Sequence, residues 1–235
     1  MGRRPRRCEN RPVLTDTASL QTVLDVCGVF VFGLSGGLVA VRRGLDLFGV
    51  LVLAWVAGLG GGIIRDLFLG ITPPVAVSDW RLLAAAVVAG GAVFLLHGVW
   101  EDDDARPAGG RRHVTRAVRL LDAAGLALFA VSGALVALSR DAGPLAATLI
   151  GGITAIGGGL LRDVLARQVP EVLQRELYAL PALAGAALVV LLDRIDLLSP
   201  LTAWLAVALV FVIRVVAGAL DLNAPRALRS TPPDR

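Results

Sequence analysis

The stretch GLGGGIIRD at residues 58–66 occurs a second time as AIGGGLLRD at residues 155–163. A shift of 97 residues aligns Asp25–Pro73 with Asp122–Pro170 without a gap, and fifteen of the 49 positions are identical. An apolar composition alone does not place three glycines, an Arg-Asp pair and a proline at one common offset. The chain therefore contains an internal repeat.

The composition is that of an integral membrane protein. Of the 235 residues, 56% are hydrophobic and 18% are charged, against about 45–50% and about 25% in soluble domains. Seven windows approach the roughly 20 apolar residues that a spanning helix needs, and none shows the alternation of a membrane β-barrel. The sequence predicts an all-α protein with seven transmembrane helices, at Leu20–Val41, Leu47–Leu69, Leu82–Trp100, Leu120–Leu138, Leu145–Leu165, Leu177–Leu192 and Leu201–Leu220.

Each repeat holds three predicted helices, and a seventh follows. Because three is odd, the second copy enters the membrane from the opposite side, as in many transport proteins with inverted repeats. The predicted organisation is an N-terminal tail (1–19), repeat 1 (20–100), a linker (101–116), repeat 2 (117–193), helix 7 (199–220) and a C-terminal tail (221–235).

The glycine triplets lie inside predicted helices 2 and 5. Glycine costs about 1 kcal/mol relative to alanine in a helix interior, so three in a row predict a kink or break. Carbonyls freed at membrane depth need a protein or aqueous partner, and a cavity lined by them suits a cation. The alternative is that the triplets permit close helix packing. The residues concerned are Gly60, Gly61, Gly62, Gly157, Gly158 and Gly159.

An arginine and an aspartate follow each triplet. Neighbours on a helix point about 100° apart, and ionisable residues in membrane spans usually pair or line a pathway. We therefore expect Arg65 to pair with Asp163, and Arg162 with Asp66, across the repeat interface. The alternative is that the charges lie at helix ends and extend into the headgroups.

Three further matched pairs are candidate pore-lining residues: Ser35 and Ser132, Phe32 and Phe129, and Asp25 and Asp122. The serine hydroxyls alternatively bond to carbonyls of their own helices. The phenylalanines either pack in the core or form a hydrophobic constriction. The aspartates lie at predicted helix starts, where the helix dipole favours a carboxylate.

The sequence gives little support for catalysis or for binding of a metal, a cofactor or nucleic acid. His97 and His113 have no metal-ligand partner at helical spacing, and Cys8 and Cys27 form no metal-binding spacing. No catalytic triad, nucleotide-binding loop or nucleic-acid-reading element is recognisable. We expect neither an enzyme nor a bound metal or cofactor.

The positive-inside rule gives an expected orientation. The side with loops 1–2, 3–4 and 5–6 and the C-terminus carries more arginines than the opposite side, which predicts a cytoplasmic C-terminus. The arginine-rich N-terminal tail argues for the reverse. Arg214, within two turns of the end of the last helix, is expected to extend toward the headgroups.

The doubled GGGxxRD motif in helices 2 and 5 of a seven-span protein resembles the prokaryotic trimeric intracellular cation (TRIC) channels. The same repeat is also described as a glycine transporter domain. The resemblance covers about Val23 to Leu220. It implies a homotrimer in the prokaryotic plasma membrane, surrounded by lipids, in which each protomer has its own pore for K⁺ and also Na⁺. The alternatives are a secondary carrier for a small amino acid such as glycine, and a membrane protein without transport activity.

Overall fold

The computed structural model describes residues 13–101, 110–174 and 178–220. Within these ranges the regular structure is entirely helical. Most of the predicted tails and part of the predicted linker lie outside the described residues. The helices are α1 (Val13–Arg42), α2 (Leu47–Phe68), α3 (Val75–Ser78), α4 (Trp80–Glu101), α5 (Gly110–Ser139), α6 (Pro144–Leu165), α7 (Glu171–Gln174), α8 (Ala179–Arg194) and α9 (Pro200–Ala219).

Six of the described helices are long and apolar enough to cross a membrane: α1, α2, α4, α5, α6 and α9. They correspond to six of the seven predicted spans. The seventh corresponds to α8, which has 16 residues and is shorter than the roughly 20 residues that a perpendicular span requires. That α8 also crosses the membrane stays a prediction.

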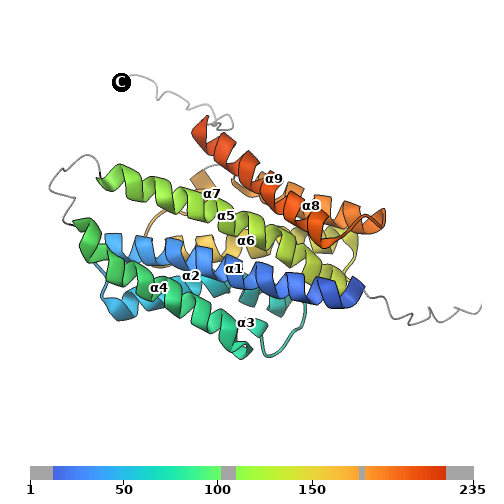
Figure 1. The fold of residues 1–235 in the computed structure, drawn as a ribbon, viewed down its shortest axis with the longest axis horizontal. Helices are drawn as coiled ribbons and strands as arrows, with labels where there is room; N and C mark the ends of the chain where they lie inside the picture. The colour runs from blue at the N-terminus through green and yellow to red at the C-terminus, as the bar shows by residue number, and fades with distance from the viewer. Residues whose placement is uncertain (1–12, 102–109, 175–177, 221–235) are drawn as a thin grey trace, which may run out of the picture.

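The repeat is visible in the helix bounds. Shifting α1 and α2 by 97 residues reproduces the first and last residues of α5 and α6. The helices α1 and α5 pack against each other, and Figure 1 shows them side by side and running in opposite directions. This is the arrangement expected of an inverted repeat.

The backbone follows the repeat even where the residue types differ. The turn after α1 contains Gly44 with φ of +70°, and the matched turn after α5 contains Asp141 with φ of +56°. After α2 and α6, Gly70 and Arg167 take φ of +68° and +52°. Left-handed backbone is uncommon for residues other than glycine. Its presence in both pairs of matched turns shows that the two copies share their turns as well as their helices.

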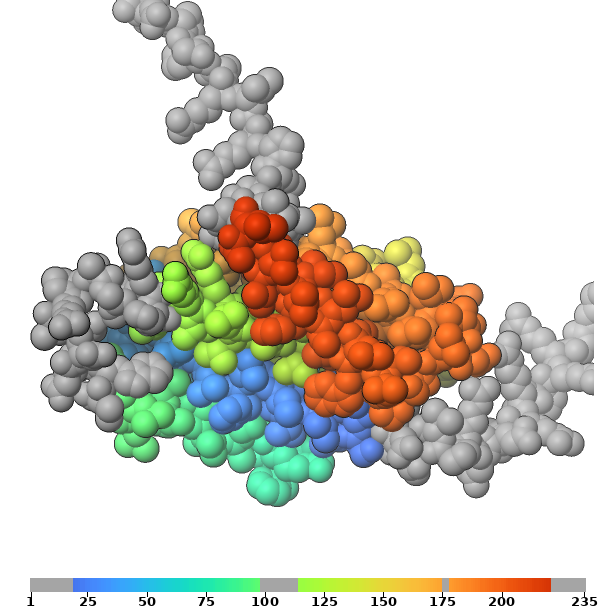
Figure 2. Space-filling model, turned by 45° about the horizontal axis from the view of Figure 1, so that its top comes forward, coloured from blue at the N-terminus to red at the C-terminus, as the bar shows by residue number. Residues whose placement is uncertain are grey.

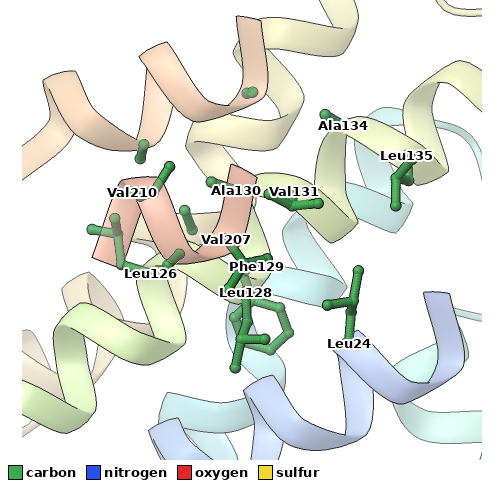
Figure 3. Packing of buried hydrophobic residues seen from close by; sticks show 14 of the residues in the cluster. Leu24, Leu126, Leu128, Phe129, Ala130, Val131, Ala134, Leu135, Val207 and Val210 are labelled. Carbon is green, nitrogen blue, oxygen red and sulfur yellow. The ribbon is translucent and has the colours of Figure 1, made fainter. Parts of the chain in front are cut away.

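The hydrophobic core lies between the two repeats and beneath α9. Leu24 of α1, Phe129 of α5 and Val207 and Val210 of α9 belong to one buried cluster, and Figure 3 shows this packing. The helix α9 lies along the outside of the bundle next to α5, as Figure 2 shows. Its outer face is apolar and exposed, for example at Leu201, which suits contact with lipid.

The expected helix breaks are absent. Both α2 and α6 continue as α-helix through their glycine triplets, so no backbone carbonyl is freed there by unwinding. The prediction of a break was wrong because a helix tolerates three glycines where tertiary packing stabilises it. A bend of the helix axis at the triplets stays a prediction.

Candidate functional site

The helices α2 and α6 cross at their glycine triplets. A Cβ atom on Gly61 would overlap the carbonyl oxygen of Thr154, and one on Gly158 would overlap the carbonyl oxygen of Ala57. Ala57 and Thr154 are separated by 97 residues, as are Gly61 and Gly158. Two contacts related in this way indicate a pseudo-two-fold axis through the crossing.

The triplets therefore serve close backbone packing, the alternative interpretation of the sequence. The six glycines are not equivalent, however. A Cβ on Gly60 would clash with the flexible end of Leu161 and would lie 3.8 Å from Gly158 Cα, and one on Gly62 would lie 3.8 Å from the Arg65 guanidinium. A Cβ on Gly159 would come within 2.9 Å of the Tyr178 hydroxyl. The middle glycine of each triplet fixes how closely the two helices approach.

A first charged cluster surrounds Arg65. Its Nε donates to Asp66 Oδ1 at 2.9 Å, and its Nη1 donates to the two carboxylate oxygens of Asp25 at 3.3 and 3.4 Å. The Ser132 hydroxyl, from the other repeat, donates to Asp25 Oδ1. Arg65 is 2% exposed and Asp66 is fully buried, so this cluster lies inside the protein.

A second charged cluster surrounds Arg162 at the matched position. Its Nε donates to Asp163 Oδ1 and its Nη1 to Asp122 Oδ1, both at 2.9 Å. The same Nη1 donates to Ser35 Oγ of the other repeat at 2.6 Å. Arg162 is 2% exposed. Each cluster thus has its salt bridges within one repeat and one serine from the other.

The predicted pairing of Arg65 with Asp163 and of Arg162 with Asp66 is wrong. Each arginine instead pairs with its own sequence neighbour and with an aspartate 40 residues earlier. The argument from helical angles failed because the guanidinium, at the end of a long side chain, can fold back toward the adjacent carboxylate. The headgroup alternative is also wrong, because these side chains are buried.

The two aspartates of the motif also hold the chain that follows. Asp66 Oδ2 accepts from the backbone N–H of Val75 at 2.8 Å, and Asp163 Oδ2 accepts from that of Glu171 at 3.0 Å. Val75 and Glu171 are the first residues of α3 and α7. The motif therefore ties a short helix in each repeat to the buried cluster. Sequence reasoning missed this role, although the matched Pro73 and Pro170 marked both segments.

The remaining candidate residues lie between the repeats. Asp25 and Asp122 are well inside α1 and α5, because both helices begin earlier than predicted, so they are not helix-start carboxylates. Phe32 and Phe129 stack with ring centroids 5.6 Å apart and planes 14° apart. Each ring also covers a glycine of the opposite helix, Gly125 for Phe32 and Gly28 for Phe129, which supports the packing interpretation.

Most of the buried polar side chains in the described part of the protein belong to these two clusters. Each cluster has one arginine against two aspartates and so carries a formal charge of −1. A buried negative charge attracts a cation or a proton, since desolvated charge needs compensation. The described residues contain no group of three or more His, Cys, Asp or Glu side chains arranged to hold a metal ion. The buried polar residues are Asp25, Ser35, Arg65, Asp66, Asp122, Ser132, Thr154, Arg162, Asp163 and Arg214.

Arg214 departs from expectation. It is 7% exposed, its guanidinium carbon lies 4.4 Å from the centroid of the Tyr178 ring, and its Nη2 lies 3.9 Å from Glu171 Oε2. It turns into the bundle because an aromatic face and a carboxylate are available there. Tyr178 is the only tyrosine of the chain, a signal that sequence reasoning passed over.

Comparison with known proteins assigns the chain to a family. The family model described as Glycine transporter matches residues 22–98 and 119–194. The chain belongs to this family. It is 44% identical to a UPF0126 membrane protein of Deinococcus radiodurans over 173 residues, which are 72% of this chain and 74% of that protein. It is 40% identical to the UPF0126 membrane protein SCO4104 of Streptomyces coelicolor over 213 residues, which are 89% and 91% of the two chains.

Solved structures of prokaryotic TRIC channels have the same fold as this Glycine transporter family member. The TRIC orthologue of Rhodobacter sphaeroides is 38% identical, with a TM-score of 0.76, and the match covers 87% of this chain and 100% of that one. A prokaryotic TRIC channel in 0.5 M KCl is 29% identical, with a TM-score of 0.78, and the match covers 88% and 100%. Together with the apolar helices, these relatives establish a multi-pass membrane protein.

Proposed function

We propose that the protein is a channel for monovalent cations, passing K⁺ and also Na⁺, with one pore in each protomer of a homotrimer. The observation that carries this proposal is the match to TRIC cation channels over nearly nine-tenths of the chain. The reciprocal contacts of the two repeats support it, because inverted repeats place a transport path at their interface.

The buried charges favour cations over anions. Both clusters at the repeat interface carry one arginine and two aspartates, and negative charge in a low-dielectric interior raises the local concentration of cations. Asp25 and Asp122 supply this field in the proposed path. Ser35 and Ser132 lie where the two repeats meet and offer oxygen atoms to a passing ion.

The glycine triplets are the proposed hinge of the path. The middle glycines bring the backbones of α2 and α6 together at the crossing, with the side chains of Leu161 and Ile64 beside Gly60 and Gly157, so a bend there opens a route lined in part by backbone. Arg65 and Arg162 anchor the C-terminal halves of these helices to α1 and α5.

A secondary carrier for a small amino acid such as glycine is the second candidate. The observation that favours it is the description of the matching family model, Glycine transporter. Inverted repeats also suit alternating access, in which one repeat moves against the other around a central site.

Reconstitution into planar bilayers separates the two candidates. The channel proposal expects unitary currents in KCl whose reversal potential in a salt gradient follows the cation. Asp25→Asn with Asp122→Asn should move that reversal potential toward the chloride value. A matched control is Asp79→Asn, which changes a carboxylate outside the two clusters that is 18% exposed and pairs with Arg81. Saturable glycine uptake into liposomes without conductance would overturn the channel and support the carrier.

The number of chains in the oligomer and the orientation of the protein in the membrane are tested separately. The mass of the detergent-solubilised protein, after correction for bound detergent, should correspond to three chains. We further propose the prokaryotic plasma membrane as its location, with a cytoplasmic C-terminus. In a Cys8→Ser, Cys27→Ser background, labelling of a cysteine placed near the C-terminus by a membrane-impermeant reagent should then require permeabilised cells.

A further inference from the structure

The third glycines of the two triplets, Gly62 and Gly159, occupy matched positions in different surroundings. A Cβ on Gly159 would lie 2.9 Å from the Tyr178 hydroxyl and 3.4 Å from Asp122 Oδ1. A Cβ on Gly62 would lie 3.8 Å from the Arg65 guanidinium, and within 4 Å of no other side chain outside its chain neighbours in the described part of the protein. The space beside the third glycine is therefore filled in the second repeat and open in the first.

Tyr178 supplies the side chain that fills this space. It directly precedes α8 and is 2% exposed. In the first repeat, the aromatic residue at the start of the corresponding helix, α4, is Trp80, which is 75% exposed and points away from the interior. One aromatic side chain therefore distinguishes the two halves of the repeat interface.

The ring of Tyr178 is held in place from α7 and α9. The Arg214 guanidinium carbon lies 4.4 Å from the ring centroid, and Arg214 Nη2 lies 3.9 Å from Glu171 Oε2. Arg214 and Glu171 carry opposite charges, so together they add no net charge to the second cluster. Arg214 Nε has no hydrogen-bond partner among the described residues, which indicates that the guanidinium is placed for the aromatic face. Arg214 thus positions Tyr178.

The Tyr178 hydroxyl lies beside a carboxylate that is incompletely bonded. Asp122 is fully buried, its Oδ1 accepts from Arg162, and its Oδ2 has no hydrogen-bond partner among the described residues. In the first cluster, both carboxylate oxygens of Asp25 accept from Arg65. A buried oxygen without a partner is costly, and a positive charge beside it relieves that cost. Asp122 Oδ2 is therefore the carboxylate oxygen at which a passing monovalent cation gains most.

We propose that Tyr178 occludes the second half of the transport path, and that a cation reaches Asp122 Oδ2 only when the ring withdraws. This regulation rests on the proposed channel function. Arg214 and Glu171 hold the ring in the occluding position. The first half, which is open beside Gly62, needs no equivalent movement. Because the cation binds only the withdrawn state, it shifts the population toward that state.

Thiol accessibility tests the occlusion without any flux measurement. Ser35 Oγ and Asp122 Oδ1 both accept from Arg162 Nη1, so a cysteine in place of Ser35 reports on the second cluster. Ser132 donates to Asp25, so Ser132→Cys is the matched reporter of the first cluster.

Each reporter is introduced into a Cys8→Ser, Cys27→Ser background of the full chain. The rate of its modification by a small cationic methanethiosulfonate reagent is followed by intact-mass spectrometry of the detergent-solubilised protein.

Tyr178→Ala should raise the modification rate of Ser35→Cys several-fold and leave that of Ser132→Cys unchanged, because the ring fills only the second half. Arg214→Gln should act in the same direction to a smaller extent, since the ring remains but loses its support. Trp80→Ala, which removes an exposed aromatic side chain, should change neither rate. An unchanged rate at Ser35→Cys, or an equal rise at both reporters, overturns the inference.

Tyr178→Phe keeps the test decisive if Tyr178→Ala does not fold. It retains the ring beneath Arg214 and removes only the hydroxyl beside Gly159, so the rate at Ser35→Cys should still rise. The same variant tests the contact itself. Gly159→Ala should lower the thermal midpoint because its methyl group would meet the hydroxyl, and adding Tyr178→Phe should recover part of the loss. A loss that Tyr178→Phe does not relieve overturns the placement of the hydroxyl.

Currents in planar bilayers test the consequence for conduction. In symmetric KCl, Tyr178→Ala should increase the fraction of time that the channel is open, and Trp80→Ala should not. An open fraction that Tyr178→Ala leaves unchanged in a conducting channel overturns the inference. A wild type that carries no cation current overturns the proposed channel function instead, and the modification rates then still decide whether Tyr178 covers the second cluster.

Discussion

Gly61 of α2 lies so close to Thr154 of α6 that a methyl group on Gly61 would overlap the Thr154 carbonyl oxygen. Replacing glycine by alanine within an exposed helix normally adds up to about 1 kcal/mol of helix stability. At Gly61 the sign should reverse, because the two backbones must separate and overpacking costs about 1–3 kcal/mol. Gly61→Ala is therefore expected to lower the thermal midpoint of the purified protein.

Gly62→Ala is the matched control, one position along the same triplet. Its Cβ would lie 3.8 Å from the nearest atom, on Arg65, so this variant should be neutral or slightly more stable than wild type. Gly158→Ala, related to Gly61→Ala by the repeat, should be as harmful as that variant. If Gly61→Ala and Gly62→Ala behaved alike, the triplet would act through helix propensity and not through the crossing.

The partners of Arg65 can be assigned by double-mutant cycles. Arg65→Gln leaves the buried Asp25 and Asp66 without their counter-ion, and breaking a buried pair in this way typically costs about 3–5 kcal/mol. Adding Asp25→Asn should recover part of the loss, with a coupling energy above about 0.5 kcal/mol. The measurement is the free energy of unfolding in mixed detergent micelles.

The same cycle with Asp163 discriminates between the two pairing schemes. Asp163 bonds to Arg162 and not to Arg65. The double variant Arg65→Gln with Asp163→Asn should therefore lose as much free energy of unfolding as the two single variants together. A coupling energy for Arg65 with Asp163 as large as that with Asp25 would restore the pairing across the repeats that the sequence pattern favoured.

The sequence predicted most of the architecture because the matched residues of its repeat are all separated by the same number of positions. The shift of 97 residues places the matched glycines, charges and prolines, and the helix bounds of α1 and α2 reproduce those of α5 and α6 at the same shift. Six of the predicted spans coincide with helices that are long and apolar enough to cross a membrane. These features depend on local pattern, which a sequence displays directly.

The partners of the charged residues were not predictable in the same way. Whether Arg65 reaches Asp25, Asp66 or Asp163 depends on side-chain direction and on where α1 begins, and neither is encoded in the spacing of the motif. Glycine triplets are similarly ambiguous, since both a helix break and a close crossing need small residues. The contact between Arg214 and Tyr178 joins segments outside the aligned repeat, so the symmetry gave no indication of it.

The anchoring of the short helices predicts a local effect of Asp66. Its Oδ2 accepts from the Val75 backbone N–H at 2.8 Å, so Asp66→Ala removes the partner that holds the start of α3. Amide hydrogen exchange at Val75 should become faster, because opening of this segment then no longer breaks that bond. Exchange at Glu171, held by Asp163 in the other repeat, serves as an internal reference. Equal acceleration at both amides would mean that the variant loosens the whole fold and that Asp66 is not a local anchor.

The stacked pair of Phe32 and Phe129 either packs in the core or forms a hydrophobic constriction of the pore, and a truncation tells these roles apart. Both rings are buried at the contact of α1 with α5, and truncating such a ring to alanine typically costs about 3–5 kcal/mol. Phe32→Ala should therefore lower the free energy of unfolding, whereas Phe48→Ala, at a position that is 74% exposed, should have little effect. Single-channel recording provides the second readout. A packing role leaves the unitary conductance of the folded fraction unchanged, while a constriction would raise it, and a stable Phe32→Ala variant with higher conductance would overturn the packing interpretation.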